Sequence, residues 1–98
     1  MSGEQSGAFA QIVEQDLVEP IKDLCALFEA QQAHAEFAFF SNLLFHLRDP
    51  DDEAEVLFAV IELSKCAFLG FVYSEEAKLR IDLLLERAIT LSHTMSAN

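Results

Sequence analysis

The stretch FAFFSNLLFHLRDPDDE, residues 37–53, decides the fold that the sequence predicts. Its first part, Phe37–Leu47, spreads large apolar side chains over nearly half of a helix circumference when each residue advances by about 100°. Ala38 and Phe45 lie outside even that wide arc. A helix that is apolar on so many sides packs against more than one neighbour. We therefore predict a buried helix here.

The second part of this stretch predicts where the next helix begins. Asp49 is a good N-cap residue, and proline is favoured at the first helical position, so Pro50 is expected to begin the helix. The acidic residues 51–53 lie next to the positive end of the helix dipole, which they stabilise. The left-handed conformation that ends many helices suits Gly70. The sequence thus predicts a helix over residues 50–69.

Two apolar stripes run along this predicted helix, and Glu55 and Glu62 lie between them. One stripe consists of Ala54, Leu57, Phe58, Ile61 and Phe68, and the other of Val56, Val60, Leu63 and Ala67. Because each stripe can cover a different neighbour, we expect this helix to lie centrally in the fold. Lys65 interrupts the first stripe, and we expect it to extend towards solvent or to meet a carboxylate such as Glu36.

The residues before this stretch predict a second long helix and a short arm. The helical pattern continues from Pro20 to Leu47, so one helix is expected there. Proline removes a backbone donor, which predicts either a kink near residues 18–20 or a helix that begins at Pro20. In both cases residues 8–19 form a short amphipathic arm.

The rest of the chain completes a single helical domain over residues 8–95. Ser74 is an N-cap signal for a last and very regular helix over residues 75–95. Residues 1–7 and 96–98 are small and polar, so we expect a disordered N-terminus and a frayed C-terminus. The predicted fold class is all-α, a small bundle of three main helices with a short N-terminal arm, completed by homodimerisation.

The expectation of a homodimer comes from the composition. The chain has 98 residues, of which 52% are apolar, and a mean hydropathy of +0.23, although its net charge is −11. A monomer of this size buries only about 65% of the surface that its unfolded chain exposes. We therefore expect a second copy to cover part of the apolar surface. The residues predicted for this dimer or ligand surface are Phe37, Phe39, Phe40, Leu44, Phe45, Val56, Val60 and Leu63.

The charge balance narrows the possible partners. Seventeen acidic residues stand against six basic ones, which are spread along the chain, so direct nucleic-acid binding and binding to anionic membranes are not expected. A strongly acidic surface suits a basic protein partner, or the imitation of nucleic acid towards a DNA-binding protein. The residues predicted for this acidic partner surface are Glu14, Asp16, Glu19, Asp23, Asp51, Asp52 and Glu55.

The sequence offers little for catalysis, cofactors or metals. His46, with Asn42 four residues before it and Asp49 three after, is the only candidate metal arrangement, and a surface or capping role is the favoured interpretation. Cys25 and Cys66 lie among apolar helical positions, which predicts buried free thiols of low reactivity. We therefore expect no catalytic residue, no metal and no cofactor, and hence a protein that is not an enzyme.

The function that these patterns favour is a non-enzymatic interaction or regulatory module. The first alternative is an acidic inhibitor that imitates nucleic acid, and the second is a carrier of a small apolar ligand in a phenylalanine-lined pocket. No secretory signal is recognisable in residues 1–10, and the longest apolar stretch, Phe37–Leu47, is far shorter than the roughly 18 residues of a membrane span. We accordingly expect a cytoplasmic protein.

Overall fold

All regular structure in residues 2–96, the part of the chain described by the computed structural model, is helical, and side chains are described for residues 7–95. The elements are α1 (Ser2–Val13), the π-helical turn η1 (Glu14–Val18), α2 (Glu19–Ala30), α3 (His34–His46), α4 (Glu53–Leu63), the 3-10 turn η2 (Cys66–Phe68) and α5 (Glu75–Ser96). The predicted all-α class is confirmed.

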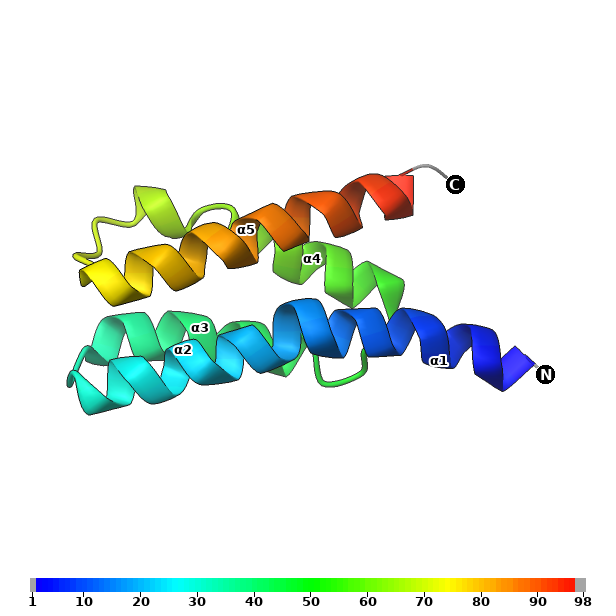
Figure 1. Ribbon diagram of the computed structural model, residues 1–98, viewed down its shortest axis with the longest axis horizontal. Coiled ribbons are helices and arrows are strands. Elements are labelled where there is room, and N and C mark those ends of the chain that lie inside the picture. Colours follow the sequence, from blue (N-terminus) through cyan, green and yellow to red (C-terminus); the bar gives the residue numbers. More distant parts are fainter. Residues whose placement is uncertain (1, 97–98) are drawn as a thin grey trace.

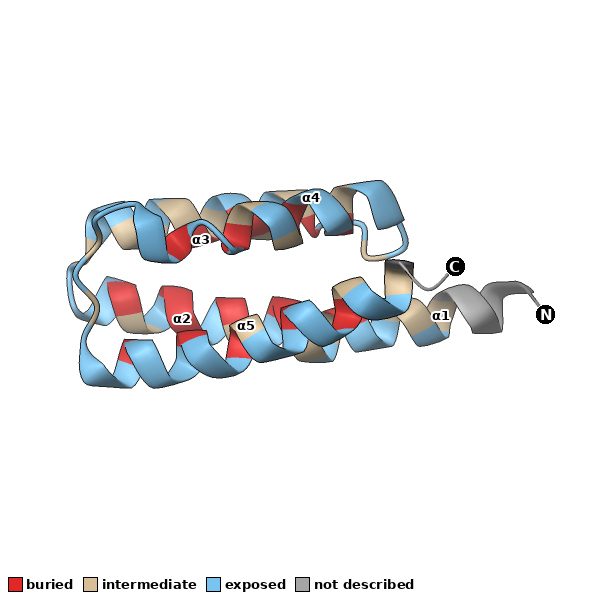
Figure 2. Ribbon diagram, turned by 90° about the horizontal axis from the view of Figure 1, so that it is seen from above, coloured by how far each residue is buried: buried red, intermediate tan, exposed pale blue. Residues whose placement is uncertain are grey.

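The helices form an up-and-down bundle of two layers. One continuous helix, made of α1, η1 and α2, lies beside α5 in the first layer, while α3 and α4 form the second (Figures 1 and 2). Successive helices run in opposite directions, and the bundle measures 45 × 22 × 18 Å. Figure 2 shows the buried residues of each layer facing the other layer. No helix in residues 2–96 is long and apolar enough to cross a membrane.

The chain passes through Pro20 without a break, so the separate N-terminal arm that the sequence predicted is not formed. The amide of Glu19 donates to the carbonyl of Glu14, five residues back, instead of four. This wider π-helical turn accommodates the proline, which has no amide hydrogen to donate. Leu17 and Val18 are buried in the same turn, so the irregular segment still contributes to the core.

The predicted helix over residues 20–47 is wrong, because α2 ends and the chain folds back at residues 31–33. The amide of Ala33 donates to the carbonyl of Phe28 at 2.8 Å, and that of Gln32 to Glu29 at 3.1 Å. These two bonds form a Schellman motif, in which Gln32 takes the left-handed position with φ of 58°. Glycine usually holds that position, so the sequence carries no obvious signal for this turn.

The turn is stabilised by the contacts that it creates. It lays α3 antiparallel to α2, and the rings of Phe28 and Phe40 pack with their centroids 5.3 Å apart. Phe40 also contacts Phe39 at 5.1 Å and Tyr73 at 6.5 Å. The side-chain amide of Gln31 donates to the hydroxyl of Ser74 at 2.9 Å, which joins the turn to the start of α5.

Helix α4 begins three residues later than predicted. The carboxylate of Asp52, not Asp49, caps the helix, because it accepts a hydrogen bond from the amide of Glu55 at 3.2 Å. Asp49 instead accepts from the amide of Asp51 at 3.2 Å, a turn contact within the preceding loop. The run of acids in this region offered several possible caps, and the tight loop after α3 selects the last of them.

The other predicted boundaries agree more closely with the structure. Gly70 has the left-handed φ of 76° that was expected, although α4 already ends at Leu63 and η2 intervenes. The hydroxyl of Ser74 accepts from the amide of Ala77 at 3.2 Å and so caps α5, as predicted. At the N-terminus, residues 2–7 prolong α1 as a helix beyond the bundle, where disorder was predicted (Figure 1). Of the frayed end predicted at residues 96–98, Ser96 is the last residue of α5, and residues 97–98 lie outside the described residues.

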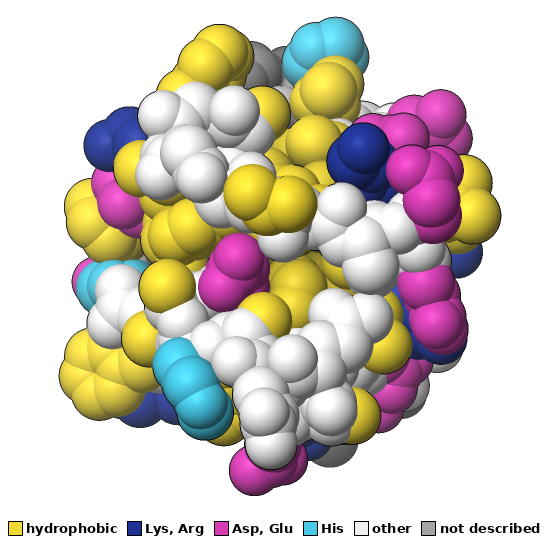
Figure 3. Space-filling view, turned by 90° about the vertical axis from the view of Figure 1, so that its left-hand side faces the viewer, with side chains coloured by type: hydrophobic (Ala, Val, Ile, Leu, Met, Phe, Trp, Pro, Cys, Tyr) yellow, Lys and Arg dark blue, Asp and Glu magenta, His cyan; other side chains and the backbone are white. Residues whose placement is uncertain are grey.

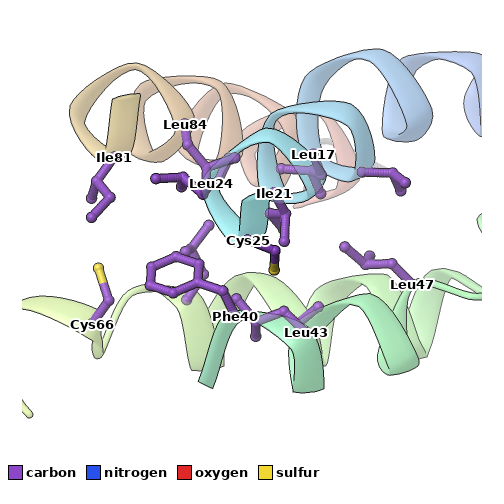
Figure 4. Packing of buried hydrophobic residues seen from close by; sticks show 14 of the residues in the cluster. Leu17, Ile21, Leu24, Cys25, Phe40, Leu43, Leu47, Cys66, Ile81 and Leu84 are labelled. Carbon is purple, nitrogen blue, oxygen red and sulfur yellow. The ribbon is translucent and has the colours of Figure 1, made fainter. Parts of the chain in front are cut away.

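The core fills the space between the two layers. Figure 4 shows side chains from α2 and η1, such as Leu17, Leu24 and Cys25, pointing towards Phe40 and Leu43 of α3. The core residues less than 2% exposed with the largest side chains are Phe28, Phe40, Leu17, Ile21, Leu24, Leu43, Leu63 and Leu84. No polar or charged residue among those described is buried. Apolar packing therefore provides the main stabilisation of the bundle.

Replacing the observed cap should weaken α4. We expect Asp52→Ala to lower the free energy of unfolding by about 1 kcal/mol, because an amide in the first turn of the helix loses its acceptor. Asp51→Ala should change it by less than about 0.5 kcal/mol. Urea titrations followed by far-UV circular dichroism measure both. Equal effects of the two substitutions would contradict the assignment of Asp52 as the cap.

Candidate functional site

The outer side of the α3–α4 layer carries an exposed apolar patch. Phe45 is 58% exposed, and on α4 the side chains of Leu57, Phe58 and Ile61 are 40%, 44% and 49% exposed. We call these four residues the α3–α4 face. They point outward because α4 turns Val56, Ala59 and Leu63 into the core. Large apolar side chains grouped on the surface are typical of sites where proteins associate.

His46 connects the two helices under this face. Its ring lies 4.6 Å from that of Phe58 and 5.6 Å from that of Phe45, and its Nδ1 lies 3.0 Å from Oε1 of Glu55. The sequence had offered Asn42 and Asp49 as its neighbours. No group of three metal-binding side chains occurs among the described residues. The contacts of His46 with Glu55 and Phe58 join α3 to α4.

Arg48 orders the end of the face. Its guanidinium carbon lies 4.2 Å from the centre of the Phe45 ring, and its Nη1 donates to the carbonyl of Phe45 at 2.8 Å. A cation held over an aromatic ring is a favourable contact, worth about 0.5–1 kcal/mol at an exposed site. Together with His46 and Glu55, Arg48 gives the apolar face a polar border. An apolar centre with a polar rim is the ordinary anatomy of a protein interface.

The structure divides the predicted dimer or ligand surface into three groups. Phe40, Val56 and Leu63 are in the core, each at most 1% exposed, so they are not available to a partner. Phe37, Phe39, Leu44 and Val60 are partly buried against that core. Phe45 alone among the eight predicted residues is well exposed.

The reason for this correction is the fold-back at residues 31–33. It brings α2 over Phe40, and the stripe of α4 that contains Val56 and Leu63 then faces the other layer. The opposite stripe, with Leu57, Phe58 and Ile61, is left outside. The sequence had identified both stripes, but without the turn it could not tell which one the chain itself would cover.

The predicted acidic partner surface is divided between local contacts and open positions. Glu19 pairs with Lys22 at 3.7 Å, Glu55 contacts His46, and Asp52 caps α4. Glu14 and Asp16 are half-buried in η1, while Asp51 is exposed in the loop before α4. Asp23 is exposed and lines a pocket of about 190 Å³ between α2 and α5, beside Arg80 and Arg87. Several of these acids thus have structural roles of their own.

The structure gives Lys65 an ion-pair partner and buries both cysteines. Lys65 pairs with Glu62 at 2.8 Å and not with Glu36. Cys25 and Cys66 are free and buried, as predicted. Burial raises the pKa of both thiols, which the hydrogen-bonding contact between Cys25 and Ser41 only partly offsets for the former. A raised thiol pKa lowers the fraction of reactive thiolate.

Of the phenylalanines that were expected to line a ligand pocket, Phe39 and Phe40 are packed against other rings. Phe40 lies within a chain of aromatic contacts, and Phe39 contacts Phe71 at 5.8 Å. Phe71 and Tyr73, which come from the connection between η2 and α5, complete this cluster. Their participation was missed because no local pattern predicts which ring a connecting segment will cover.

No protein-family model, no curated protein and no solved structure matches this chain. The features of the molecule that bear on its function are therefore the α3–α4 face and the pockets.

Core and surface phenylalanines should respond differently to truncation. Phe40→Leu is expected to lower the free energy of unfolding by about 1–2 kcal/mol, because it leaves a cavity among packed rings. Phe68→Leu should change it by less than about 0.5 kcal/mol, since Phe68 is 84% exposed. Urea unfolding at low protein concentration measures both. Equal losses would show that Phe40 is not a core residue.

The buried thiols should also affect chemistry and stability. At pH 8 we expect the native thiols to react with an aromatic disulfide reagent at least about tenfold more slowly than those of the urea-unfolded chain. A Cys66→Ala variant isolates the rate of Cys25. Equal rates in the native and unfolded chains would contradict the burial.

The same raised pKa predicts a loss of stability in alkali. Below the ordinary thiol pKa of 9.0, both the folded and the unfolded chain keep their thiols protonated, so the thiols add no pH dependence. Above it the unfolded chain ionises first, which lowers the free energy of unfolding as pH rises. Urea midpoints at pH 8 and pH 10 measure the effect, and the Cys25→Ala/Cys66→Ala variant should show a smaller fall than the native chain.

Proposed function

We propose that this chain is a non-enzymatic protein-interaction module that pairs with a second copy through the α3–α4 face. The observation that carries the proposal is the exposure of Phe45 on α3 and of Leu57, Phe58 and Ile61 on the adjacent α4, with the His46 ring near the rings of Phe45 and Phe58. Burying such side chains is favourable, at about 25 cal/mol for each Å² of apolar surface removed from water.

The charges along α4 support a second copy as the occupant. Two α4 helices that pack antiparallel about a two-fold axis near Phe58 and Ile61 place Lys65, which follows α4 and pairs with Glu62 in the single chain, opposite the acidic first turn, residues 53–55, of the other copy. A two-fold interface uses the same patch on both copies, so it must be complementary to itself. The exposed stripe that contains Leu57, Phe58 and Ile61 suits this requirement, because acids lie at one end of it and Lys65 at the other.

The shape of the bundle is also suitable. A stable interface buries about 800 Å² on each partner. The α3–α4 layer forms one broad side of a molecule that measures 45 × 22 × 18 Å, and its outer surface is unpartnered in the single chain (Figure 2). In the proposed dimer the α2–α5 layers remain outside, and their exposed acids, such as Glu29 and Glu86, suit a basic protein partner. The module would then act by recruiting that partner.

Sedimentation velocity at about 10–100 µM tests the pairing, because association depends on protein concentration. We expect the native chain to sediment at twice 11.0 kDa. Phe58→Asp and Ile61→Asp should each yield a folded monomer, since a buried unpaired carboxylate opposes association. Leu79→Asp is the matched control, because Leu79 is 67% exposed on α5, away from the face.

The outcomes separate clearly. A dimer that persists in Leu79→Asp and dissociates in the two α4 variants supports the proposal. A native mass of 11.0 kDa over the whole concentration range would refute the pairing. Dissociation by Leu79→Asp, with the α4 variants still dimeric, would place the interface on α5 instead. Circular dichroism confirms that each variant is folded.

A further inference from the structure

A second feature of the molecule, independent of the α3–α4 face, is a pocket of about 220 Å³ between η2, the segment after it and α5. Its lining residues are Cys66, Ala67, Phe71, Tyr73, Lys78, Ile81, Asp82 and Leu85. Figure 3 views the molecule from the end where this connection lies and shows hydrophobic side chains exposed between charged ones. The volume is below the roughly 300–1,000 Å³ of drug-sized sites, which restricts it to a small ligand.

The inner part of the pocket is apolar and ordered. Phe71 and Tyr73 meet at nearly right angles with their centroids 6.0 Å apart. The hydroxyl of Tyr73 donates to the carbonyl of Cys66 at 2.9 Å, which holds the tyrosine ring in place. Burial raises the pKa of Tyr73 and of Cys66, so both groups are neutral at pH 7. The floor and walls therefore suit an uncharged aliphatic or aromatic group.

The rim of the pocket carries one charge of each sign on the same helix. Lys78 and Asp82 are four residues apart on α5, so their Cβ atoms are separated by about 5–6 Å. They form no ion pair with each other; Lys78 instead pairs with Glu75 at 3.6 Å. A lysine that precedes an acid by four residues is the weaker orientation for pairing within a helix. Because Glu75 is itself almost fully exposed, its pair with Lys78 is weak, and Asp82 has no ion pair within the described residues, so both charges can still meet another molecule.

The carboxylate of Asp82 acts on the pocket floor. Its negative charge contributes to raising the pKa of the Cys66 thiol, after the larger effect of burial. The carboxylate is therefore close enough to influence the floor electrostatically. A ligand that enters with only a negative charge meets repulsion from Asp82, and one with only a positive charge meets repulsion from Lys78.

We propose that this pocket binds a free α-amino acid with an apolar side chain, such as leucine. Its ammonium group pairs with Asp82, its carboxylate with Lys78, and its side chain lies against Phe71 and Leu85. The ligand replaces water at two charged groups and covers the apolar floor at the same time. This site goes beyond the proposed pairing, since it shares no residue with the α3–α4 face.

The chain contains a built-in probe for this binding. Tyr73 is its only tyrosine, and it has no tryptophan, so intrinsic fluorescence excited at the tyrosine band reports the pocket alone. We expect L-leucine to change this fluorescence with saturation. The analogues 4-methylpentanoate, which lacks the ammonium group, and isoamylamine, which lacks the carboxylate, should each bind at least about tenfold more weakly, since each loses a charge-assisted hydrogen bond.

Variants test the two charges separately. Lys78→Gln and Asp82→Asn are each expected to weaken L-leucine binding at least about tenfold, whereas Lys22→Gln, which breaks a similar ion pair on α2, should leave it unchanged. Similar affinity for leucine and both analogues would overturn the proposal in favour of simple apolar binding. No saturable change with any of the three compounds would also overturn it. The analogue series uses the native chain, so it does not depend on the folding of a variant.

Discussion

The contact between Phe28 and Phe40 is the interaction on which the bundle depends. It lies across the α2–α3 turn, and it exists only because Gln32 accepts the left-handed conformation there. Once α3 lies against α2, its inner side is covered and its outer side must face elsewhere, so α4 is placed as a neighbour within the second layer. Tyr73 then reaches the same rings and closes one end of the bundle. The fold thus grows outward from one aromatic pair.

The fold class and several helix boundaries could be predicted from the sequence because they depend on local chemistry. Ser74 caps a helix wherever it precedes one, and Gly70 has no competitor for a left-handed position. The turn at residues 31–33 could not be predicted, since glutamine there is locally unfavourable and only the distant aromatic contact stabilises it. Because this turn was not predicted, buried residues were assigned to the dimer or ligand surface. Whether Val56 or Phe58 faces solvent depends on neighbours that the turn supplies, and helical periodicity alone cannot distinguish them.

The acidic composition has a structural explanation that is partly separate from any partner. Asp49, Asp52 and Glu55 organise the short connection between α3 and α4, where they hold a turn, cap a helix and fix His46. These contacts are local, and each contributes on the order of 1 kcal/mol. They also keep charge off the apolar residues of α4 and on their border.

The π-helical turn has a consequence for the geometry of the long first helix. Its core residues Val13, Leu17, Ile21, Leu24 and Phe28 recur on average every 3.75 residues or so, against about 3.6 in an α-helix. On an ideal α-helix such a stripe would drift around the helix axis. Neighbouring helices could then stay in contact with it only by forming a right-handed supercoil. The five-residue turn at Glu14–Val18 absorbs the difference. The continuous first helix can therefore contact both α3 and α5.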